Sequence, residues 1–92
     1  MKKIALVLAS LMVFSAVAFA ADIEMQSVKS TLLDKVGYDP EAKVLAVQMK
    51  YSSDVYLYQN VPMDIFDDLL AADSKGAYYV KNIKGKYKTE RK

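Results

Sequence analysis

The sequence predicts an α+β domain in which a three-stranded antiparallel β-meander is followed by one amphipathic helix and a shorter C-terminal helix, both packed on one face of the sheet. Apolar residues alternate over residues 44–51 with the period of two that is typical of a half-buried strand. Over residues 62–73 they recur instead at helical spacing. A chain of 92 residues, 53% of them hydrophobic, has room for one small core, so a single domain is expected.

The first strand is predicted over residues 31–39, TLLDKVGYD. Its apolar markers, Leu33 and Val36, are three residues apart, which breaks strict alternation and predicts a β-bulge or a late start of the strand. Asp39 and Pro40 then begin a four-residue turn, because aspartate suits the first turn position and proline the second.

The second strand is predicted in KVLAVQMKY, and a turn then leads into a third strand that contains two tyrosines. If the connecting loop is two or four residues long, Met49 pairs with Tyr56. Val47 then pairs with Tyr58, and both rings share a face with the larger apolar residues of the second strand. A three-residue loop would place Leu57 on that face instead. Even loops are the commoner ones in hairpins, so both tyrosines are predicted to face inward, beneath a helix.

The amphipathic helix is predicted in PMDIFDDLLAAD, residues 62–73, with Pro62 at the first helical position, where its missing N–H costs nothing. Its apolar stripe consists of Ile65, Phe66, Leu69 and Leu70. Ser74 is expected to cap the second helix, KGAYYVKNI, and Gly85 to end it. Tyr79 and Ile83 are four residues apart in this helix and therefore share a face.

The N-terminus has the three-part layout of a secretory signal peptide. Lys2 and Lys3 supply the positive start, an almost wholly apolar run follows, and AFA at 18–20 supplies small residues around a cleavage site. A permanent membrane anchor is the alternative, but two serines interrupt the run and no basic stop-transfer cluster follows it. Cleavage after Ala20 is expected, which gives a periplasmic or secreted protein without a stable membrane span.

Cysteine and histidine are absent from the chain. The commonest general base, the usual transition-metal ligands and the familiar nucleophile–base pairs are therefore missing. Ser52, Ser53 and Asp54 lie in a predicted turn, and nothing in the sequence supplies an activating base beside them. We therefore expect a protein that is not an enzyme and that uses no cofactor.

The charges of the chain are segregated along the sequence. Residues 21–73 carry 10 acids and 4 bases, whereas residues 74–92 carry 1 acid and 7 bases. Such asymmetry indicates a partner or an intramolecular contact. One hypothesis is that the basic end folds back on Asp64, Asp67 and Asp68 of the helix, or reaches those of a neighbouring molecule. The three aspartates are close enough in sequence to share a calcium ion, but they lack a liganding loop, so no metal site is expected.

Four landmarks occur in a fixed order: VGYD at 36–39, YLY at 56–58, NVP at 60–62 and SKGAYYVKNI at 74–83. Together they resemble the KTSC domain, which also occurs at the C-terminal end of some lysyl-tRNA synthetases and as a stand-alone bacterial protein. The resemblance covers roughly Val28 to Tyr87. The family has no established enzymatic function, and the RNA binding suggested from the synthetase context fits an exported protein poorly. The motif residues that the resemblance implies, expected to be structural, are Gly37, Tyr38, Asp39, Tyr56, Tyr58, Pro62 and Gly76.

The expected role is that of a small exported binding or accessory module acting through contact with an unknown protein partner or through self-association. Its surface would be the outward sheet face of Val44, Ala46 and Leu57. The alternative is binding of a polyanion (nucleic acid, an acidic glycan or a lipid head group) by the basic C-terminal segment. The residues of that alternative site are Tyr78, Lys81, Lys84, Lys86, Tyr87, Lys88 and Arg91. The expected organisation is a signal peptide at 1–20, a leader at 21–30, a KTSC-like domain at 31–85 and a basic tail at 86–92.

Overall fold

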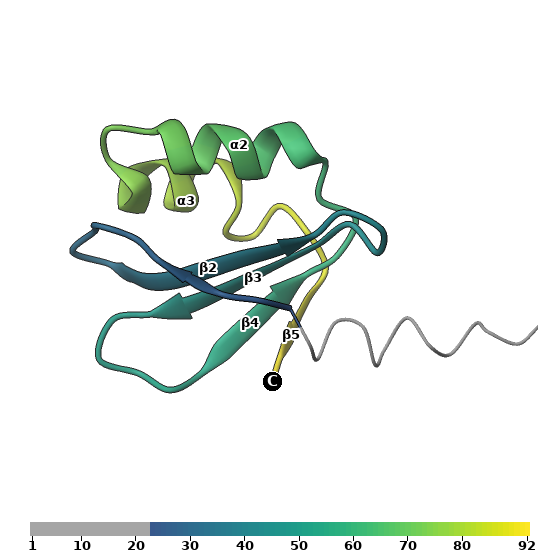
Figure 1. Ribbon diagram of the computed structural model, residues 1–92, viewed down its shortest axis with the longest axis horizontal. Helices are drawn as coiled ribbons and strands as arrows, with labels where there is room; N and C mark the ends of the chain where they lie inside the picture. The colour runs from purple at the N-terminus through teal and green to yellow at the C-terminus, as the bar shows by residue number, and fades with distance from the viewer. Residues whose placement is uncertain (1–22) are drawn as a thin grey trace, which may run out of the picture.

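The computed structural model describes residues 23–92, so the predicted signal peptide lies outside the described part. These residues form an antiparallel sheet of five strands in the order β1-β2-β3-β4-β5, with two helices above one face (Figure 1). The elements are β1 (Gln26–Ser27), β2 (Leu33–Asp39), β3 (Val44–Met49), β4 (Val55–Tyr58), α2 (Met63–Ala71), α3 (Lys75–Asn82) and β5 (Thr89–Arg91). Within residues 23–92, no helix has the length and apolar character needed to cross a bilayer.

The first predicted strand and turn are confirmed, although the strand begins at Leu33 rather than at residue 31. β2 pairs with β3, and its register shifts between Leu33 and Lys35, where the spacing of apolar residues predicted a bulge. In the turn that follows, the carboxylate of Asp39 accepts the backbone N–H groups of Glu41 and Ala42, at 3.0 and 3.2 Å. The side chain thus stabilises the turn from its first position, as the sequence indicated.

The pairing of β3 with β4 places the two central tyrosines on the predicted face. Tyr58 lies opposite Leu45. Tyr56 lies opposite Val47, so both phenol rings share the face of these apolar side chains. The predicted partners were wrong by two residues, because the last pair before the turn is Gln48 with Val55, which makes the connection longer but leaves its parity unchanged. Parity, which decides the face, is therefore correct although the register is not.

Both helices lie where the sequence predicted them. Pro62 is the N-cap of α2, one position before the predicted place, with extended backbone angles. Ser74 caps α3, and its hydroxyl accepts the backbone N–H of Ala77 at 3.2 Å. Gly85 follows α3 with a φ of +78°, a left-handed conformation that suits glycine after a helix.

The core lies between the helices and the face of the sheet that they cover. Its buried side chains are Leu33, Val36, Leu45, Val47, Tyr58, Val61, Leu69, Tyr79 and Ile83. Every strand from β2 to β4 and both helices contribute to it, and Ile83 comes from the turn after α3. Tyr79 and Ile83 thus both face the sheet, as their spacing predicted.

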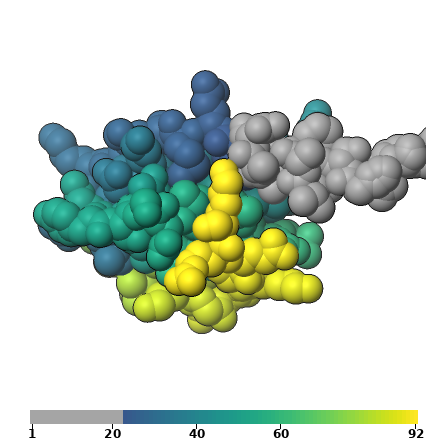
Figure 2. All heavy atoms as spheres, turned by 90° about the horizontal axis from the view of Figure 1, so that it is seen from below, coloured from purple at the N-terminus to yellow at the C-terminus, as the bar shows by residue number. Residues whose placement is uncertain are grey.

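The predicted number of three strands is wrong, because both ends of the domain add a strand. β5 lies inside the segment expected to be a tail and pairs with β4, with Thr89 opposite Tyr58. Figure 2 shows these C-terminal residues, in yellow, as an exposed ridge over the teal strand residues. β1 lies inside the expected leader and pairs with β2, with Gln26 opposite Val36.

The residues just before β1 cover the face of the sheet that turns away from the helices. We call residues 23–25 the strap. A Cβ atom built on Gly37 would lie well inside van der Waals distance of the Glu24 carbonyl oxygen and 2.8 Å from Cγ2 of Ile23. Glycine at this position therefore permits the strap to cross the strand in backbone contact, the role that a strand glycine often has.

The outward face predicted as a contact surface is largely buried in the monomer. Ala46, which pairs with Gly37, is 1% exposed, and Val44 is 8% exposed. Of the three residues proposed for that surface, Leu57 alone is half-buried rather than buried. The expectation of an exposed apolar patch is therefore wrong for Val44 and Ala46.

Candidate functional site

The hydroxyl groups of Tyr58 and Tyr79 form a hydrogen bond in the middle of the core. The two rings meet edge to face, with centroids 6.0 Å apart and an interplanar angle of 76°. A buried hydroxyl without a partner destabilises a fold, and here each satisfies the other. Burial raises the pKa of Tyr58, and the hydrogen bond with Tyr79 raises it further. Burial also raises the pKa of Tyr79. The pair therefore has a structural role in the core, and its rings are too buried to contact a ligand.

Alkaline pH is expected to destabilise the protein through this pair. Because the folded state holds both phenol protons more tightly, the unfolded state loses them first, near the ordinary tyrosine pKa of 10.0. The contribution of the pair to the free energy of unfolding is constant below that pH and falls as the pH rises above it. Urea unfolding between about pH 8 and about pH 11 measures this dependence.

The matched variant for that experiment is Tyr58→Phe/Tyr79→Phe, which removes both hydroxyls together. All other side chains are common to the two proteins, so the difference between their slopes reports the phenol pair. The double variant is expected to lose stability less steeply above about pH 10 than the wild type. Equal slopes for the two proteins would show that the phenol pair does not set the alkaline limit.

Tyr38, in the VGYD motif, joins the sheet to the segment before α2. Its hydroxyl donates to the backbone carbonyl of Val61 at 2.5 Å. Its ring stacks on Phe66 of α2, with centroids 5.3 Å apart and an interplanar angle of 15°. Burial raises the pKa of Tyr38, and the neighbouring carboxylates of Asp39 and Asp64 add to the effect. The ring is half-buried and packs on the core.

The basic residues predicted for polyanion binding are exposed, but the tyrosines grouped with them are not. Side chains exposed to solvent are Lys81, Lys84, Lys86, Lys88 and Arg91. Tyr78 and Tyr87 are half-buried and pack against the core. Burial raises the pKa of Tyr78, and the carboxylate of Asp68 raises it further, so this ring lies in negative surroundings. The lysines and Arg91 are therefore the accessible part of the predicted polyanion site, and the two tyrosines are only partly accessible.

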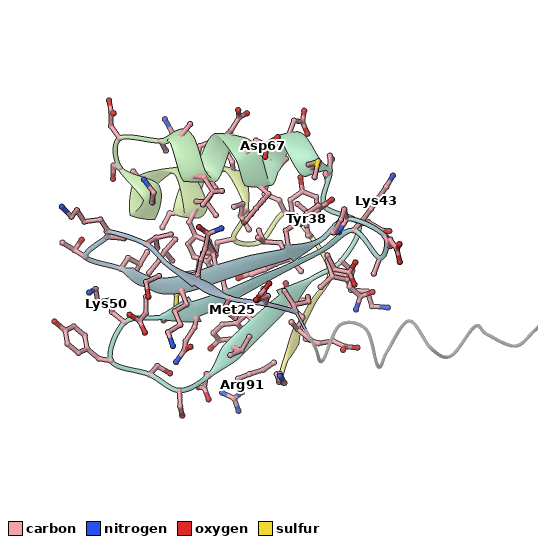
Figure 3. All side chains as sticks on the ribbon, viewed as in Figure 1. Met25, Tyr38, Lys43, Lys50, Asp67 and Arg91 are labelled. Carbon is pink, nitrogen blue, oxygen red and sulfur yellow. The ribbon has the colours of Figure 1, made fainter. Side chains whose placement is uncertain are left out.

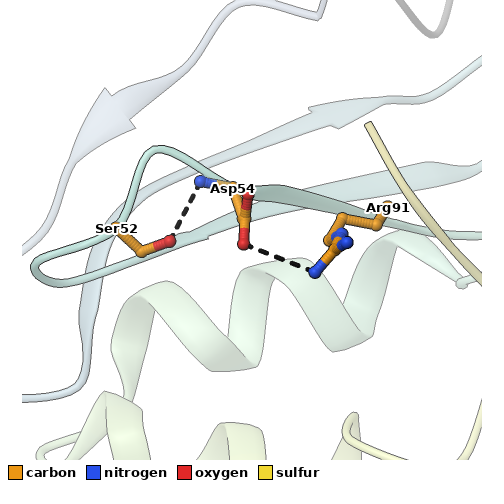
Figure 4. Close-up of polar contacts among 3 residues, drawn as sticks. All are labelled: Ser52, Asp54 and Arg91. Carbon is orange, nitrogen blue, oxygen red and sulfur yellow. Dashed lines mark hydrogen bonds and ion pairs between the residues drawn. The ribbon is translucent and has the colours of Figure 1, made fainter.

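The basic end does not fold back on the acidic helix. Asp64, Asp67 and Asp68 are exposed, and Figure 3 shows Asp67 on α2, far from Arg91 at the opposite side of the domain. Arg91 lies on β5 and forms an ion pair of 3.6 Å with Asp54, before β4 (Figure 4). The same aspartate donates its backbone N–H to the Ser52 hydroxyl at 3.0 Å. The C-terminal segment therefore pairs with β4 as a strand, and its ion pair is with Asp54 rather than with the aspartates of α2. The described residues 23–92 contain no group of three or more acidic or other metal-ligating side chains that could hold a metal ion.

An open cavity of about 430 Å³ lies where the β1–β2 loop meets the turn between α2 and α3. Two sequence segments, KST at 29–31 and DSKG at 73–76, form it together. Its lining residues are Lys29, Ser30, Thr31, Asp73, Ser74, Lys75 and Gly76. Gly76 permits the close approach of the two segments, because a Cβ added there would lie 3.1 Å from Cβ of Leu32.

The hydroxyl groups of the cavity are oriented by the backbone. The Ser30 hydroxyl accepts the N–H groups of Leu32 and Leu33, at 3.1 and 3.0 Å. The Ser74 hydroxyl accepts the N–H of Ala77 as the cap of α3. A serine hydroxyl that serves as an acceptor still has its own hydrogen to donate. Ser30 and Ser74 can therefore each donate one hydrogen bond to a bound group.

The charges of the cavity favour an anion. Lys29 and Lys75 contribute two ammonium groups, and Asp73 contributes one carboxylate. The ammonium of Lys75 donates to the carbonyl of Ala72, the C-cap of α2, at 3.1 Å. This bond uses one of its three N–H groups and positions the other two. The start of α3 adds the positive end of a helix dipole to the same side.

None of the cavity residues except Gly76 was among the predicted site residues. Lys29 and Lys75 are far apart in the sequence. Neither has a neighbouring motif that distinguishes it from an ordinary surface lysine. The one local signal was Ser74, which was expected only as a helix cap. The contact between the two segments is a property of the tertiary structure, so no pattern within either segment predicted the cavity.

Comparison with known proteins agrees with the fold just described. A model of the KTSC domain matches residues 29–87. A protein of Tsukamurella paurometabola is 39% identical over 64 residues, which cover 70% of this chain and 94% of that protein. A protein of Stutzerimonas stutzeri is 38% identical over 53 residues, covering 58% of this chain and 73% of that protein. The crystal structure of a KTSC domain protein from Yersinia pestis matches with a TM-score of 0.72 at 30% identity, covering 76% of this chain and 97% of that one.

Proposed function

The chain belongs to the KTSC domain family, and from that premise we propose that it is a small exported, non-catalytic module that binds an anionic group in the cavity beside α3. The observation that carries this proposal is the composition of the cavity. Two lysines and three hydroxyl-bearing residues from two separate segments converge on one space. Hydrogen-bond donors outnumber acceptors among them, which is what an anion requires.

The size of the cavity supports a small ligand. Sites for small molecules occupy about 300–1,000 Å³, and this cavity has about 430 Å³. A phosphate, sulfate or carboxylate group with a modest substituent fits such a volume. The carboxylate of Asp73 favours a ligand that also has a hydroxyl or amine to donate.

The non-catalytic part of the proposal rests on the chemistry of the lining. The chain has no cysteine and no histidine, so the usual activating base is missing. Ser30 and Ser74 use their oxygen atoms to accept backbone N–H groups, which is a structural duty. Binding therefore accounts for these residues without a chemical step.

Neutralising the cavity is expected to abolish binding of inorganic phosphate. In the proposed experiment, phosphate is titrated at constant ionic strength and amide shifts are followed by NMR. Shifts are expected at Thr31, Lys75 and Gly76 in the wild type. The Lys29→Gln/Lys75→Gln variant should bind at least about tenfold more weakly, because two charge-assisted contacts are lost.

The control for this experiment is Lys81→Gln/Lys84→Gln, which removes the same charge from exposed positions at the other end of α3 and beyond it. This control should bind phosphate like the wild type. Equal weakening of phosphate binding in both variants would mean that the protein attracts phosphate through its net charge and not through a site. Such attraction is screened by salt. Absence of shifts at the cavity amides would contradict the proposal.

The exposed basic segment keeps a second proposal open, namely binding of a polyanion. Lys81 in the last turn of α3 is exposed, as are Lys84, Lys86 and Lys88 between α3 and β5. Attraction of this kind depends steeply on salt and does not need a cavity. Loss of polyanion binding in the Lys81→Gln/Lys84→Gln variant, with phosphate binding retained, would assign the two functions to different surfaces. Of the outward sheet residues expected to contact a protein partner or a second copy, Leu57 is the one that stays partly accessible, and Leu57→Lys tests such contact by sedimentation.

A further inference from the structure

The hairpin between β3 and β4 holds a tyrosine entirely in solvent. Tyr51 is 99% exposed, more than any other large apolar side chain described in residues 23–92. Its φ is +61°, in the left-handed region that few residues other than glycine and asparagine adopt without cost. An exposed ring buries no apolar surface, and a left-handed tyrosine adds backbone strain. Neither property stabilises the fold. Strained residues of this kind are found at binding sites, so Tyr51 is a candidate for contact with a ligand.

The tip of this hairpin lies next to the rim of the cavity. The backbone N–H of Lys50 donates to the carbonyl of Leu32 at 2.9 Å, and Leu32 follows the cavity residue Thr31. Leu32 is itself an exposed apolar side chain and contacts the start of α3 beside Gly76. Figure 3 shows Lys50 at the end of the sheet opposite Lys43. In Figure 1 that end also carries the β1–β2 loop and the turn between the helices.

We infer that the ligand of the cavity is a phosphate ester that carries a ring, with the phosphate between Lys29 and Lys75 and the ring against Tyr51. This inference rests on the proposed function, because it assigns the rest of a ligand whose anionic group occupies the cavity. Leu32 connects the two positions, because its exposed side chain lies beside the start of α3 and its carbonyl accepts the backbone N–H of Lys50. Both a nucleoside and a sugar present a ring face that stacks on a phenol, and either one satisfies this arrangement.

Four probes separate the parts of the ligand in the full mature chain. They are inorganic phosphate, adenosine monophosphate, glucose 6-phosphate and adenosine. Tyr51→Ala is expected to leave the affinity for inorganic phosphate unchanged and to weaken binding of a ring-bearing phosphate about tenfold, the usual loss when a stacking ring is removed. Tyr51→Phe keeps the ring and should retain the wild-type affinity. Val80→Ala, at another exposed apolar position, is the matched control.

The outcomes distinguish this inference from the proposed function. A loss for adenosine monophosphate alone identifies a base as the ring, and an equal loss for glucose 6-phosphate identifies a sugar. If phosphate binds and Tyr51→Ala affects none of the probes, the ring contact is refuted while the anion site stands. If none of the phosphates shifts the cavity amides, both are refuted. Because Tyr51 makes no core contact, its variants should melt like the wild type, and their thermal unfolding checks this.

Discussion

Replacing Gly37 with alanine is expected to lower the free energy of unfolding by about 3 kcal/mol, near the upper end of overpacking effects. The added methyl would collide with backbone, the Glu24 carbonyl, and with Cγ2 of Ile23 at 2.8 Å. A backbone carbonyl cannot rotate away as a side chain can. The strap must then leave the sheet, and Ala46 beneath it would become exposed to water. Urea unfolding measures the loss, and amide shifts of residues 23–25 report the displacement.

Gly76→Ala is the matched control for this prediction. The methyl added there would meet a side-chain atom, Cβ of Leu32, at 3.1 Å, which requires a shift of only a few tenths of an ångström. Alanine is a better helix former than glycine at this position of α3, which offsets the strain, so the net change should stay within about 1 kcal/mol. Two equal losses, or unchanged shifts of the strap in Gly37→Ala, would mean that the strap does not press on the sheet in solution.

Ending the chain after Asn82 is expected to abolish folding. The deletion removes Ile83, which is fully buried, and Tyr87, which packs against the core. Loss of a buried isoleucine alone costs about 2–5 kcal/mol, while small domains have only about 5–15 kcal/mol in total. The deletion also removes β5 and the carbonyl of Lys88, which accepts the N–H of Gln59 at 2.9 Å. Narrow amide dispersion and no cooperative thermal transition are the expected observations.

The control for this truncation keeps the chain intact and removes its charges. Lys81, Lys84, Lys86 and Lys88 are exposed, so replacing all four with glutamine should change the stability little. A truncated chain that still unfolds cooperatively would show that the C-terminal segment is dispensable. Because the truncated chain is not expected to fold, truncation is a poor test of polyanion binding. Substitutions at these lysines are the suitable test.

The elements that the sequence predicted well are those whose signal is local. The spacing of Leu33 and Val36 predicted the bulge of β2 because a bulge changes the alternation of the strand itself. Ser74 predicted the start of α3 because a cap bonds to the next turn of its own helix. Even the inward placement of Tyr58 required only that the hairpin loop be even in length, and it did not require the correct register.

The elements that were missed depend on residues distant in the sequence. β5 is short and highly charged, so its composition indicated a solvated tail, yet it pairs with β4 at the edge of the sheet. Charged residues are common on such edges because they discourage pairing with other chains. Gly37 was recognised only as part of a motif. Its place in the middle of a strand was nevertheless a signal that another backbone comes close.

The sequence alone determined the alternation of the strands, the apolar stripe of α2, the cap of α3 and the face on which the two central tyrosines lie. These features follow from the periodicity of a single segment, and neighbouring residues are enough to specify them. The tertiary structure alone decided that the strap covers Ala46, that β5 closes the sheet edge and that Lys29 lies near Lys75. Each of these depends on how the chain folds back on itself, which is decided by packing in three dimensions.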